Sequence, residues 1–186
     1  MAKPVLQVII GSTRPGRVGP TVADWVAHRA KQQDDFEVEV TDLAELNLPF
    51  FDEPNHPRQR RYVHQHTMDW SAVVDRSDAF VFVIPEYNHT FNAATKNALD
   101  YLHQEWQNKP AGIVSYGGAS GGANAARALE PVLSALNMVP ADTPVSIQAI
   151  REHLDDAGRL QPTQTMDAAA TAMLTQLAGR AESLAA

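Results

Sequence analysis

The sequence predicts a doubly wound α/β domain, in which helices cover both faces of a parallel sheet. Three short runs, 5–10, 79–84 and 111–114, are almost entirely apolar, as is typical of strands that are buried on both faces. Segments with helical periodicity separate these runs, and such alternation indicates parallel pairing. The chain has 186 residues, 44% of them hydrophobic and 20% charged, which suits a globular core. We therefore expect residues 1–186 to form a single domain.

The first three elements follow from their side-chain patterns. Residues 5–10 (VLQVII) are rich in β-branched side chains and predict the first strand. A helix is expected from residue 20 or 21 to about residue 33, because apolar side chains recur every four residues along one face. Residues 36–40 (FEVEV) alternate between apolar and charged side chains, which predicts a strand with one wetter face, near the edge of the sheet.

The remaining chain continues the same alternation. Residues 43–61 contain three prolines and are expected to form an irregular surface loop. The remaining strands are expected at 79–84 and 111–114, with a weaker fifth strand around 143–147, and the remaining helices at 62–76, 93–102, 123–137 and 163–184. Residues 148–162 are polar, and their pattern predicts no particular element.

Composition argues against several classes of protein. The formal net charge is −7, and an acidic chain repels nucleic-acid backbones and anionic lipid, so neither is expected as a partner. The chain has no cysteine, which excludes disulfides, thiolate zinc sites, cysteine-ligated iron–sulfur clusters and a cysteine nucleophile. No stretch approaches the roughly 18 apolar residues of a membrane span, and the N-terminus does not resemble a secretory signal. A cytoplasmic protein is the expectation.

Three loops with unusual composition follow predicted strands. Ligands of doubly wound domains bind beyond the carboxyl ends of the strands, and this rule selects residues 11–19, 85–92 and 115–122. These loops are rich in glycine, hydroxyl groups, arginine or aromatic residues. We therefore expect the functional site to lie where they meet.

The first loop, GSTRPGRVG, is predicted to bind a phosphate. It combines hydroxyls, two arginines and flexible amides at the start of a helix, where anions are favoured; the alternative is a glycine turn with solvated arginines. Gly11 and Gly16 have the spacing of a nucleoside-triphosphate loop, but Arg17 and Val18 replace the lysine and the magnesium-binding hydroxyl. The dinucleotide glycine pattern is also missing, so a terminal monophosphate without metal fits best.

The other two loops are suited to a planar ligand. Residues 85–88 (PEYN) can form a flat wall and aim backbone groups at the polar edge of a ring; the alternative is an ordinary turn that ends a strand. Residues 115–122 (SYGGASGG) allow the backbone to approach a ligand and to donate amides to anionic oxygens. The alternative there is simple flexibility at the entry to a helix.

Other polar clusters predict no chemistry. His64 and His66 are expected to point apart on a helix, so no metal site is expected there. The basic run at 58–61 indicates a solvated face, with contact to the phosphate of a second cofactor as the lesser alternative. No Ser–His–Asp set has a defensible spacing, and no catalytic side chain is assigned.

The three loops together resemble the NADPH-dependent FMN reductase family, flavodoxin-like reductases of quinones, azo dyes and chromate. The matching stretches are GSTRPGR, PEYNHTFNAATKNALDYL and SYGGASGGANAARALEPVL. The resemblance implies a five-stranded sheet of order 2-1-3-4-5, with FMN bound non-covalently at the carboxyl ends of the strands. The implied activity is hydride transfer from NADPH or NADH to the flavin, and on to a quinone, an azo compound, a metal oxyanion or free flavin.

The resemblance also assigns roles to individual residues. The expected phosphate contacts are Ser12 and Arg14, with Arg17 helping and Val18 lining the site. The loop expected against the isoalloxazine comprises Pro85, Glu86, Tyr87 and Asn88. The loop expected near the pyrimidine edge comprises Ser115, Tyr116, Gly117 and Gly118. Many members of the family have a small hydroxyl residue in place of Arg17, so the phosphate contacts are expected to differ here.

Hydride chemistry is carried by the flavin, so the protein needs no acid–base triad. The amides of Gly117 and Gly118 are expected to face the negative charge of reduced flavin. Two alternatives stay open: a non-enzymatic FMN electron carrier of the flavodoxin type, and a protein that binds a sugar or nucleotide monophosphate without redox chemistry.

The family resemblance further implies a homodimer or a dimer of dimers. The helices after the third and fourth strands would pack across a two-fold axis, and their richness in alanine and leucine allows close contact. Phe91, Tyr101 and Trp106 are aromatic residues suited to such an interface.

Overall fold

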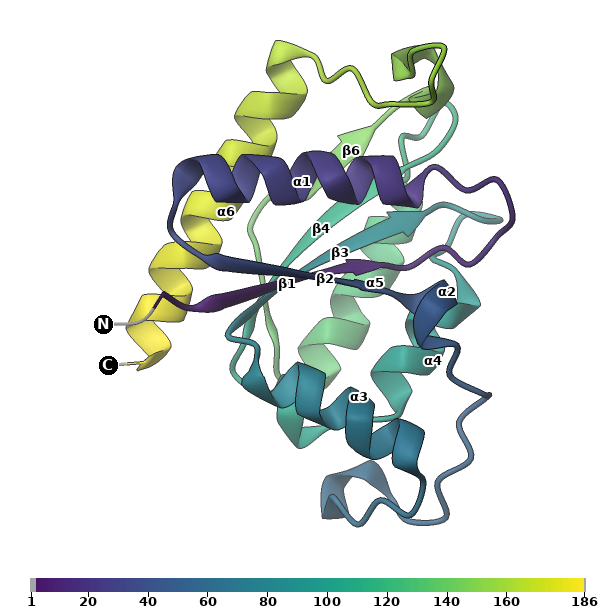
Figure 1. The fold of residues 1–186 in the computed structure, drawn as a ribbon, viewed down its shortest axis with the longest axis vertical. Helices are drawn as coiled ribbons and strands as arrows, with labels where there is room; N and C mark the ends of the chain where they lie inside the picture. Colours follow the sequence, from purple (N-terminus) through teal and green to yellow (C-terminus); the bar gives the residue numbers. More distant parts are fainter. Residues whose placement is uncertain (1–2, 186) are drawn as a thin grey trace.

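The computed structural model describes residues 3–185 and shows a parallel sheet with helices on both faces (Figure 1). The strands are β1 (Val5–Ile10), β2 (Glu37–Asp42), β3 (Ala79–Pro85), β4 (Pro110–Tyr116), β5 (Val139–Pro140) and β6 (Val145–Ile147). Their order is β2-β1-β3-β4-β5, with β6 also paired to β4. The predicted fold class and strand order are confirmed.

The helices form two layers around this sheet. They are α1 (Gly19–Gln33), α2 (Leu43–Leu46), α3 (Gln65–Arg76), α4 (Ala93–Asp100), α5 (Ala123–Ala135) and α6 (Gln164–Ala185), with short 3-10 turns η1 (Pro57–Gln59), η2 (Gln104–Trp106) and η3 (Ile150–His153). α1 and α6 cover one face, and α3, α4 and α5 lie on the other (Figure 1). None of the helices in this part of the chain is both long and apolar enough to cross a membrane.

Burial of the strands follows their composition. β3 and β4 are buried at every position, and β1 is buried at all but its first residue. β2 carries alternating charges and lies at the edge of the sheet, where those side chains reach solvent. The predicted edge position of this strand is therefore confirmed. Two apolar clusters, one on each face of the sheet, form the core.

The fifth strand position differs from the prediction. β6 pairs with the end of β4 and lies within the expected range 143–147, whereas β5, which pairs with the start of β4, is an additional short strand that was not expected. The residues between them, 141–144, leave the ladder. Between the two paired segments β4 has only two residues, 112–113, whereas the opposite chain has four, 141–144, so the extra residues bulge out of the ladder.

The irregular segment before α3 is more structured than predicted. It contains the short helix α2 and the turn η1. The expected helix over 62–76 begins only at Gln65, because the backbone N–H groups of Val63 and His64 donate to the buried Glu53 carboxylate (2.9 and 3.1 Å). Those hydrogen bonds hold the preceding chain in an extended conformation.

Candidate functional site

The three predicted loops meet at the carboxyl end of the sheet and are joined by hydrogen bonds. Asn92 Nδ2 donates to the carbonyl of Gly11 (2.6 Å), which ties the loop after β3 to the loop after β1. The N–H of Glu86 donates to the carbonyl of Tyr116 (3.0 Å), which ties the loop after β3 to the end of β4. The three loops therefore form one continuous surface.

The first loop, residues 11–18, leads directly into α1. Ser12 is only 1% exposed, and its hydroxyl forms a hydrogen bond with that of Tyr87 (3.0 Å). Val18 occupies the N-cap position and supplies no side-chain acceptor within the described chain. The first turn of any α-helix leaves N–H groups without an intrahelical partner. In α1 Pro20 has no N–H, so the first-turn amides without an intrahelical partner are those of Gly19 and Thr21, and such amides favour an anionic ligand.

The two arginines of this loop have different surroundings. Arg17 pairs through Nη2 with the Asp42 carboxylate at the end of β2. Its Nε is buried and has no hydrogen-bond partner within residues 3–185. Arg14 is exposed and takes part in no ion pair within the same residues. The guanidinium of Arg14 is therefore fully available to bind a ligand, whereas that of Arg17 is partly engaged by Asp42.

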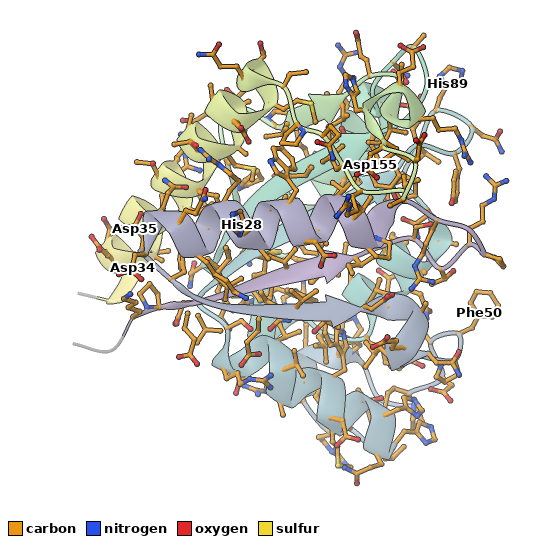
Figure 2. All side chains as sticks on the ribbon, turned by 45° about the horizontal axis from the view of Figure 1, so that its top comes forward. His28, Asp34, Asp35, Phe50, His89 and Asp155 are labelled. Atoms are coloured by element: carbon orange, nitrogen blue, oxygen red, sulfur yellow. The ribbon has the colours of Figure 1, made fainter. Side chains whose placement is uncertain are left out.

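The second loop turns sharply after β3. Tyr87 and Thr90 exchange two backbone hydrogen bonds (2.9 and 3.1 Å). The residues between them, Asn88 and His89, have φ of 50° and 63°, as a type I′ turn requires. The expected stiff turn is confirmed. Asn88 is exposed at its tip, and Figure 2 places His89 at the outer edge of the molecule.

Glu86 fastens this second loop to helix α5. Its carboxylate accepts hydrogen bonds from the backbone N–H and the side-chain amide of Asn124 (both 3.0 Å), in the first turn of the helix. Burial alone would raise the pKa of Glu86, but the hydrogen bonds from Asn124 and Ser120 and from the Ala125 amide hold that pKa below its ordinary value. Glu86 is therefore ionised at neutral pH and also acts as the cap of α5.

Ser115 and Gly122 form the buried part of the third loop. The Ser115 hydroxyl donates to the carbonyl of Gly121 (3.3 Å) and lies 3.2 Å from the Ser146 hydroxyl, so this side chain serves the fold. Gly122 has a φ of 83°, and a Cβ there would come within 2.7 Å of the Ser115 Cβ. Only glycine fits this close approach.

Gly117 and Gly118 form the open part of the same loop. The N–H of Gly117 donates to the carbonyl of Ile147 (3.3 Å), so the expectation that both amides face a ligand is wrong for Gly117. The N–H of Gly118 forms no hydrogen bond within residues 3–185, and a Cβ at this position would have nothing within 4 Å. Gly118 therefore carries the open amide of the pair.

Tyr116, at the end of β4, carries an unpartnered hydroxyl. Its side chain is 5% exposed, and the hydroxyl makes no hydrogen bond of good geometry in the part of the chain that the structure describes, although the Ser12 hydroxyl lies near enough to affect its pKa. The hydroxyl reaches the start of α1, where a Cβ on Gly19 would lie 3.1 Å from it. Burial raises the pKa of this phenol above its ordinary value, so the hydroxyl keeps its proton. A buried donor without a partner costs about 1–3 kcal/mol, which a ligand oxygen would relieve.

These loops enclose a hollow of about 160 Å³. Its wall consists of Ser12, Arg14, Gly16, Arg17, Val18, Pro85, Glu86, Tyr87, Tyr116, Gly117, Ile150 and Arg151. An adjoining hollow of about 250 Å³ shares Gly117, Ile150 and Arg151 and adds Gly118, Ala149 and Glu152. We call the two hollows together the groove; its size suits a small ligand, for which about 300–1,000 Å³ is usual. Among the predicted site residues, Asn88 and Ser115 line neither hollow.

Sequence reasoning missed five residues of the wall of the groove. Gly16 has a φ of 69° in the first loop, and the other four, Ala149, Ile150, Arg151 and Glu152, come from the polar segment 148–162, for which no element was predicted. That segment carries no motif. Because β6 ends at Ile147, however, the rule that selected the other loops also selects the residues that follow it.

A larger hollow, of about 500 Å³, lies between α2 and α4. Thr13 is the one residue of the first loop that lines this hollow. Within the described residues, its wall contains no charged side chain. Phe50, on the loop after α2, lies at its rim and is 86% exposed (Figure 2). A wall of this composition does not suit a phosphate, so the smaller groove is the better candidate site despite its volume.

His64 and His66 do not point apart as expected. His64 is the N-cap residue of α3 and lies just outside the helix, so its ring stacks on that of His66 with centroids 5.1 Å apart. His66 Nε2 lies 3.1 Å from the Asp52 carboxylate. A search of the described residues finds no group of three histidine or acidic side chains placed to hold a metal ion.

The chain is similar in sequence to proteins named as FMN reductases and to an azoreductase. The family model described as NADPH-dependent FMN reductase matches residues 5–151. A Schizosaccharomyces pombe protein named NAD(P)H-dependent FMN reductase is 40% identical over 153 residues, covering 81% of this chain and 76% of the relative. An NADPH azoreductase from Bacillus sp. (strain OY1-2) is 32% identical over 139 residues, covering 72% of each chain.

A solved structure supports the fold. The flavoenzyme NAD(P)H:(acceptor) oxidoreductase FerB of Paracoccus denitrificans superposes with a TM-score of 0.75 and 20% identity, covering 95% of this chain and 98% of that one. At such identity the likeness shows the fold alone. Together with the strand order, it confirms the flavodoxin-like architecture.

Proposed function

This chain belongs to the NADPH-dependent FMN reductase family, and from this premise we propose that the groove at the carboxyl ends of β1, β3 and β4 holds its FMN. The protein is an oxidoreductase with FMN as cofactor and NADPH or NADH as electron donor. Bound FMN supplies the hydride chemistry. The chain's own residues then have three tasks: to hold the phosphate, to orient the ring and to limit the access of water.

The observation that carries this proposal is a set of unpartnered donors on one wall of the groove. The Tyr116 hydroxyl, the Arg17 Nε and the Arg14 guanidinium all lack a partner within residues 3–185, and all three residues line the same hollow. A phosphate offers several acceptor oxygens and a double negative charge, so it satisfies such a set. The residues present therefore fit the phosphate of FMN.

The start of α1 completes this phosphate site. Its first-turn amides carry the partial positive charge of a helix N-terminus, and the buried Ser12 hydroxyl lies beside them. Tyr116 takes a different place from the one the family resemblance implied. Its hydroxyl lies near Gly19 at the start of α1, so we assign it to the phosphate end and not to the pyrimidine edge.

The opposite side of the groove is suited to the isoalloxazine ring. Pro85 and Tyr87 are held in place by the type I′ turn and by the bond between Glu86 and Tyr116. Gly118 leaves space and an open amide on the next loop. We propose that the ring lies against Pro85 and Tyr87, with the amide of Gly118 donating to its polar edge.

The groove is open to solvent beyond the proposed ring site, so a second small molecule can approach. We propose that NADPH or NADH and then a small acceptor occupy this space in turn. The acceptor class includes quinones, azo compounds, metal oxyanions and free flavin, and the similarity to an azoreductase supports an azo compound among them. No side chain is given a proton-transfer role.

Two measurements test this function. The purified protein loaded with FMN is expected to show a flavin absorption band near about 450 nm that bleaches when NADPH or NADH is added without oxygen. Steady-state oxidation of NADPH should then follow the addition of a quinone or an azo dye. Bleaching without turnover would leave only an electron carrier, and absence of FMN binding would contradict the proposal as a whole.

We further propose a homodimer or dimer of dimers, on different grounds from the sequence argument. Tyr101 and Trp106 are fully buried inside this chain, so the expectation that they form an interface is wrong. The exposed apolar side chains on this side include Phe50 and Phe51, beside the larger hollow, and Ala93 at the start of α4. Light scattering should give at least twice the mass of one chain, and Phe50→Ser should lower it.

A further inference from the structure

The segment after β6 is built into the wall of the groove. The N–H groups of Ala149 and Ile150 donate to the carbonyls of Gly118 and Gly117 (3.0 and 3.2 Å). Ala149 has a φ of 44°, a conformation that costs a residue with a Cβ about 1 kcal/mol or more. The turn η3 follows at once, so these bonds set the direction in which its side chains leave the backbone.

Arg151, in the turn η3, is a cation without a counter-ion. It lines both hollows of the groove and is exposed. Its side chain forms no ion pair or hydrogen bond within residues 3–185. Other arginines pair with carboxylates: Arg17 with Asp42, Arg29 with Asp167, Arg60 with Asp75 and Glu105, Arg76 with Glu39, Arg159 with Asp155 and Arg180 with Asp142.

We propose that Arg151 binds a phosphate group of NADPH or NADH and so selects the electron donor. This inference rests on the proposed FMN site. FMN carries a single phosphate, which the start of α1, Arg14 and Tyr116 would hold. Arg151 lines that hollow too, but it also lines the adjoining one beside Gly117 and Gly118, where neither Arg14 nor Tyr116 reaches. A second cation beside Gly117 and Gly118 therefore faces a different anion. The nicotinamide dinucleotides supply one, because they carry a pyrophosphate and, in NADPH, a 2′-phosphate as well.

Exposure and charge both suit contact with a co-substrate. Arg151 is exposed, so it can engage a molecule that arrives and leaves in each cycle. The chain has a net charge of −7, which repels an anionic dinucleotide at long range. An uncompensated guanidinium at the mouth of the groove offsets that repulsion where the donor must dock, and its planar fork matches a phosphate.

The basic run at 58–61, the other candidate for a second phosphate, is placed elsewhere. Figure 1 shows it on the loop before α3, at the opposite end of the molecule from the segment after β6. Arg60 is engaged by Asp75 and Glu105, and Arg58 Nε donates to His103 (3.0 Å). Arg61 is exposed on this loop, which makes it a matched control.

The test compares Arg151→Gln with Arg61→Gln, since each removes one positive charge. FMN-loaded protein is titrated with NADP⁺ and NAD⁺ by calorimetry, and KM and kcat are measured with NADPH and NADH. Arg151→Gln should weaken NADP⁺ binding about tenfold and raise the KM for NADPH about as much. The dissociation constant for FMN and kcat should stay unchanged, and Arg61→Gln should match the wild type.

A comparison of NADP⁺ with NAD⁺ shows which phosphate group of the dinucleotide Arg151 binds. Weakening confined to NADP⁺ would assign Arg151 to the 2′-phosphate, and equal weakening with NAD⁺ would assign it to the pyrophosphate; either result supports the inference. Wild-type affinities in Arg151→Gln would overturn it, as would a loss of FMN binding, which would make Arg151 a cofactor ligand. A wild type that binds no FMN would instead contradict the proposed function.

Discussion

Two regions of this protein concentrate polar and aromatic side chains, but only one leaves donors unpartnered. In the loop between α2 and α3, residues 47–64, Glu53 accepts the amides that precede α3, and Arg60 pairs with Asp75 and Glu105. In the groove, the Tyr116 hydroxyl and the Arg17 Nε have no partner in the described chain. Residue type alone thus does not identify a ligand site. Three other buried polar atoms without partners in residues 3–185, Arg29 Nε, Gln33 Oε1 and Thr67 Oγ1, line none of the hollows described above. The more specific signal is therefore a pair of unpartnered donors that line one hollow.

The comparison implies that the two regions should respond differently to substitution. The loop 47–64 uses its charges for folding, so changes there should lower the free energy of unfolding and leave cofactor affinity intact. The hydrogen-bond donors of the groove have no partner in the described part of the fold and are proposed to bind the ligand. Substitutions there should therefore lower FMN affinity and leave the free energy of unfolding of the apoprotein unchanged. Four experiments test this division, from the largest expected effect to the smallest.

The largest effect is expected for Glu105→Ala, beside the loop 47–64. Glu105 is buried, its carboxylate accepts hydrogen bonds from Tyr62 and Ser71 (both 2.7 Å), and Arg60 lies 3.2 Å away. Its removal leaves these buried donors without an acceptor, so the free energy of unfolding should fall by about 3 kcal/mol. Urea unfolding measures this. A loss of FMN affinity in the protein that remains folded would break the comparison.

The next effect is expected for Arg14→Gln in the groove. Removal of one charge-assisted contact to the phosphate should weaken FMN binding about thirtyfold, or about 2 kcal/mol. The thermal midpoint of the apoprotein should not change, because Arg14 has no ion-pair partner within residues 3–185. Fluorescence titration gives the affinity, and Arg61→Gln is the charge-matched control. A lower apoprotein midpoint with unchanged affinity would assign Arg14 to folding instead.

Tyr116→Phe gives a sharper test of the unpartnered donor. The substitution removes a hydroxyl that the apoprotein leaves unsatisfied, so the free energy of unfolding without ligand should stay equal or rise slightly. FMN affinity should nevertheless fall about five- to tenfold. Apoprotein that becomes clearly less stable would show that the hydroxyl has a partner inside the fold.

The smallest effect is expected at Glu86, as a pH dependence of stability. This residue serves both the fold and the proposed ligand site, because it caps α5 and lines the groove. Hydrogen bonds hold its folded-state pKa below the ordinary value of 4.5, so its contribution to stability is present above that pH and is lost as pH falls through the folded-state pKa. Glu86→Gln should cost about 1 kcal/mol at pH 7. The urea midpoints of Glu86→Gln and of the wild type should approach each other as the pH is lowered from 7 to 3. A difference between the two proteins that stays constant with pH would contradict this role of Glu86.

Most of the fold could be predicted from the sequence because apolar runs and helical periodicity are local signals. The runs at 5–10 and 79–84 produced strands at nearly those bounds. The presence of β5 before β6 depends on the register of both against β4, in which residues 141–144 face only residues 112–113, and periodicity does not show that register. Likewise, the late start of α3 depends on Glu53, a residue more than ten positions away.

The site was predicted in part. The three loops carried motifs, and the structure brings most of their predicted residues around one groove. Ile150 and Arg151 carried no motif, and their place depends on the backbone bonds to Gly117 and Gly118. The pairing of Arg17 with Asp42 depends on the adjacency of β1 and β2, so sequence alone could not show that Arg14 is the freer of the two arginines.

The central claim is that the start of α1 and the loop before it hold the phosphate of FMN. The most direct test is to titrate the wild type and Arg14→Gln with FMN and with riboflavin, which lacks only the phosphate. FMN should bind the wild type about a hundredfold more tightly than riboflavin, and Arg14→Gln should shrink that ratio by weakening FMN alone. Equal affinity of the wild type for the two flavins, or a ratio that Arg14→Gln leaves unchanged, would contradict the claim.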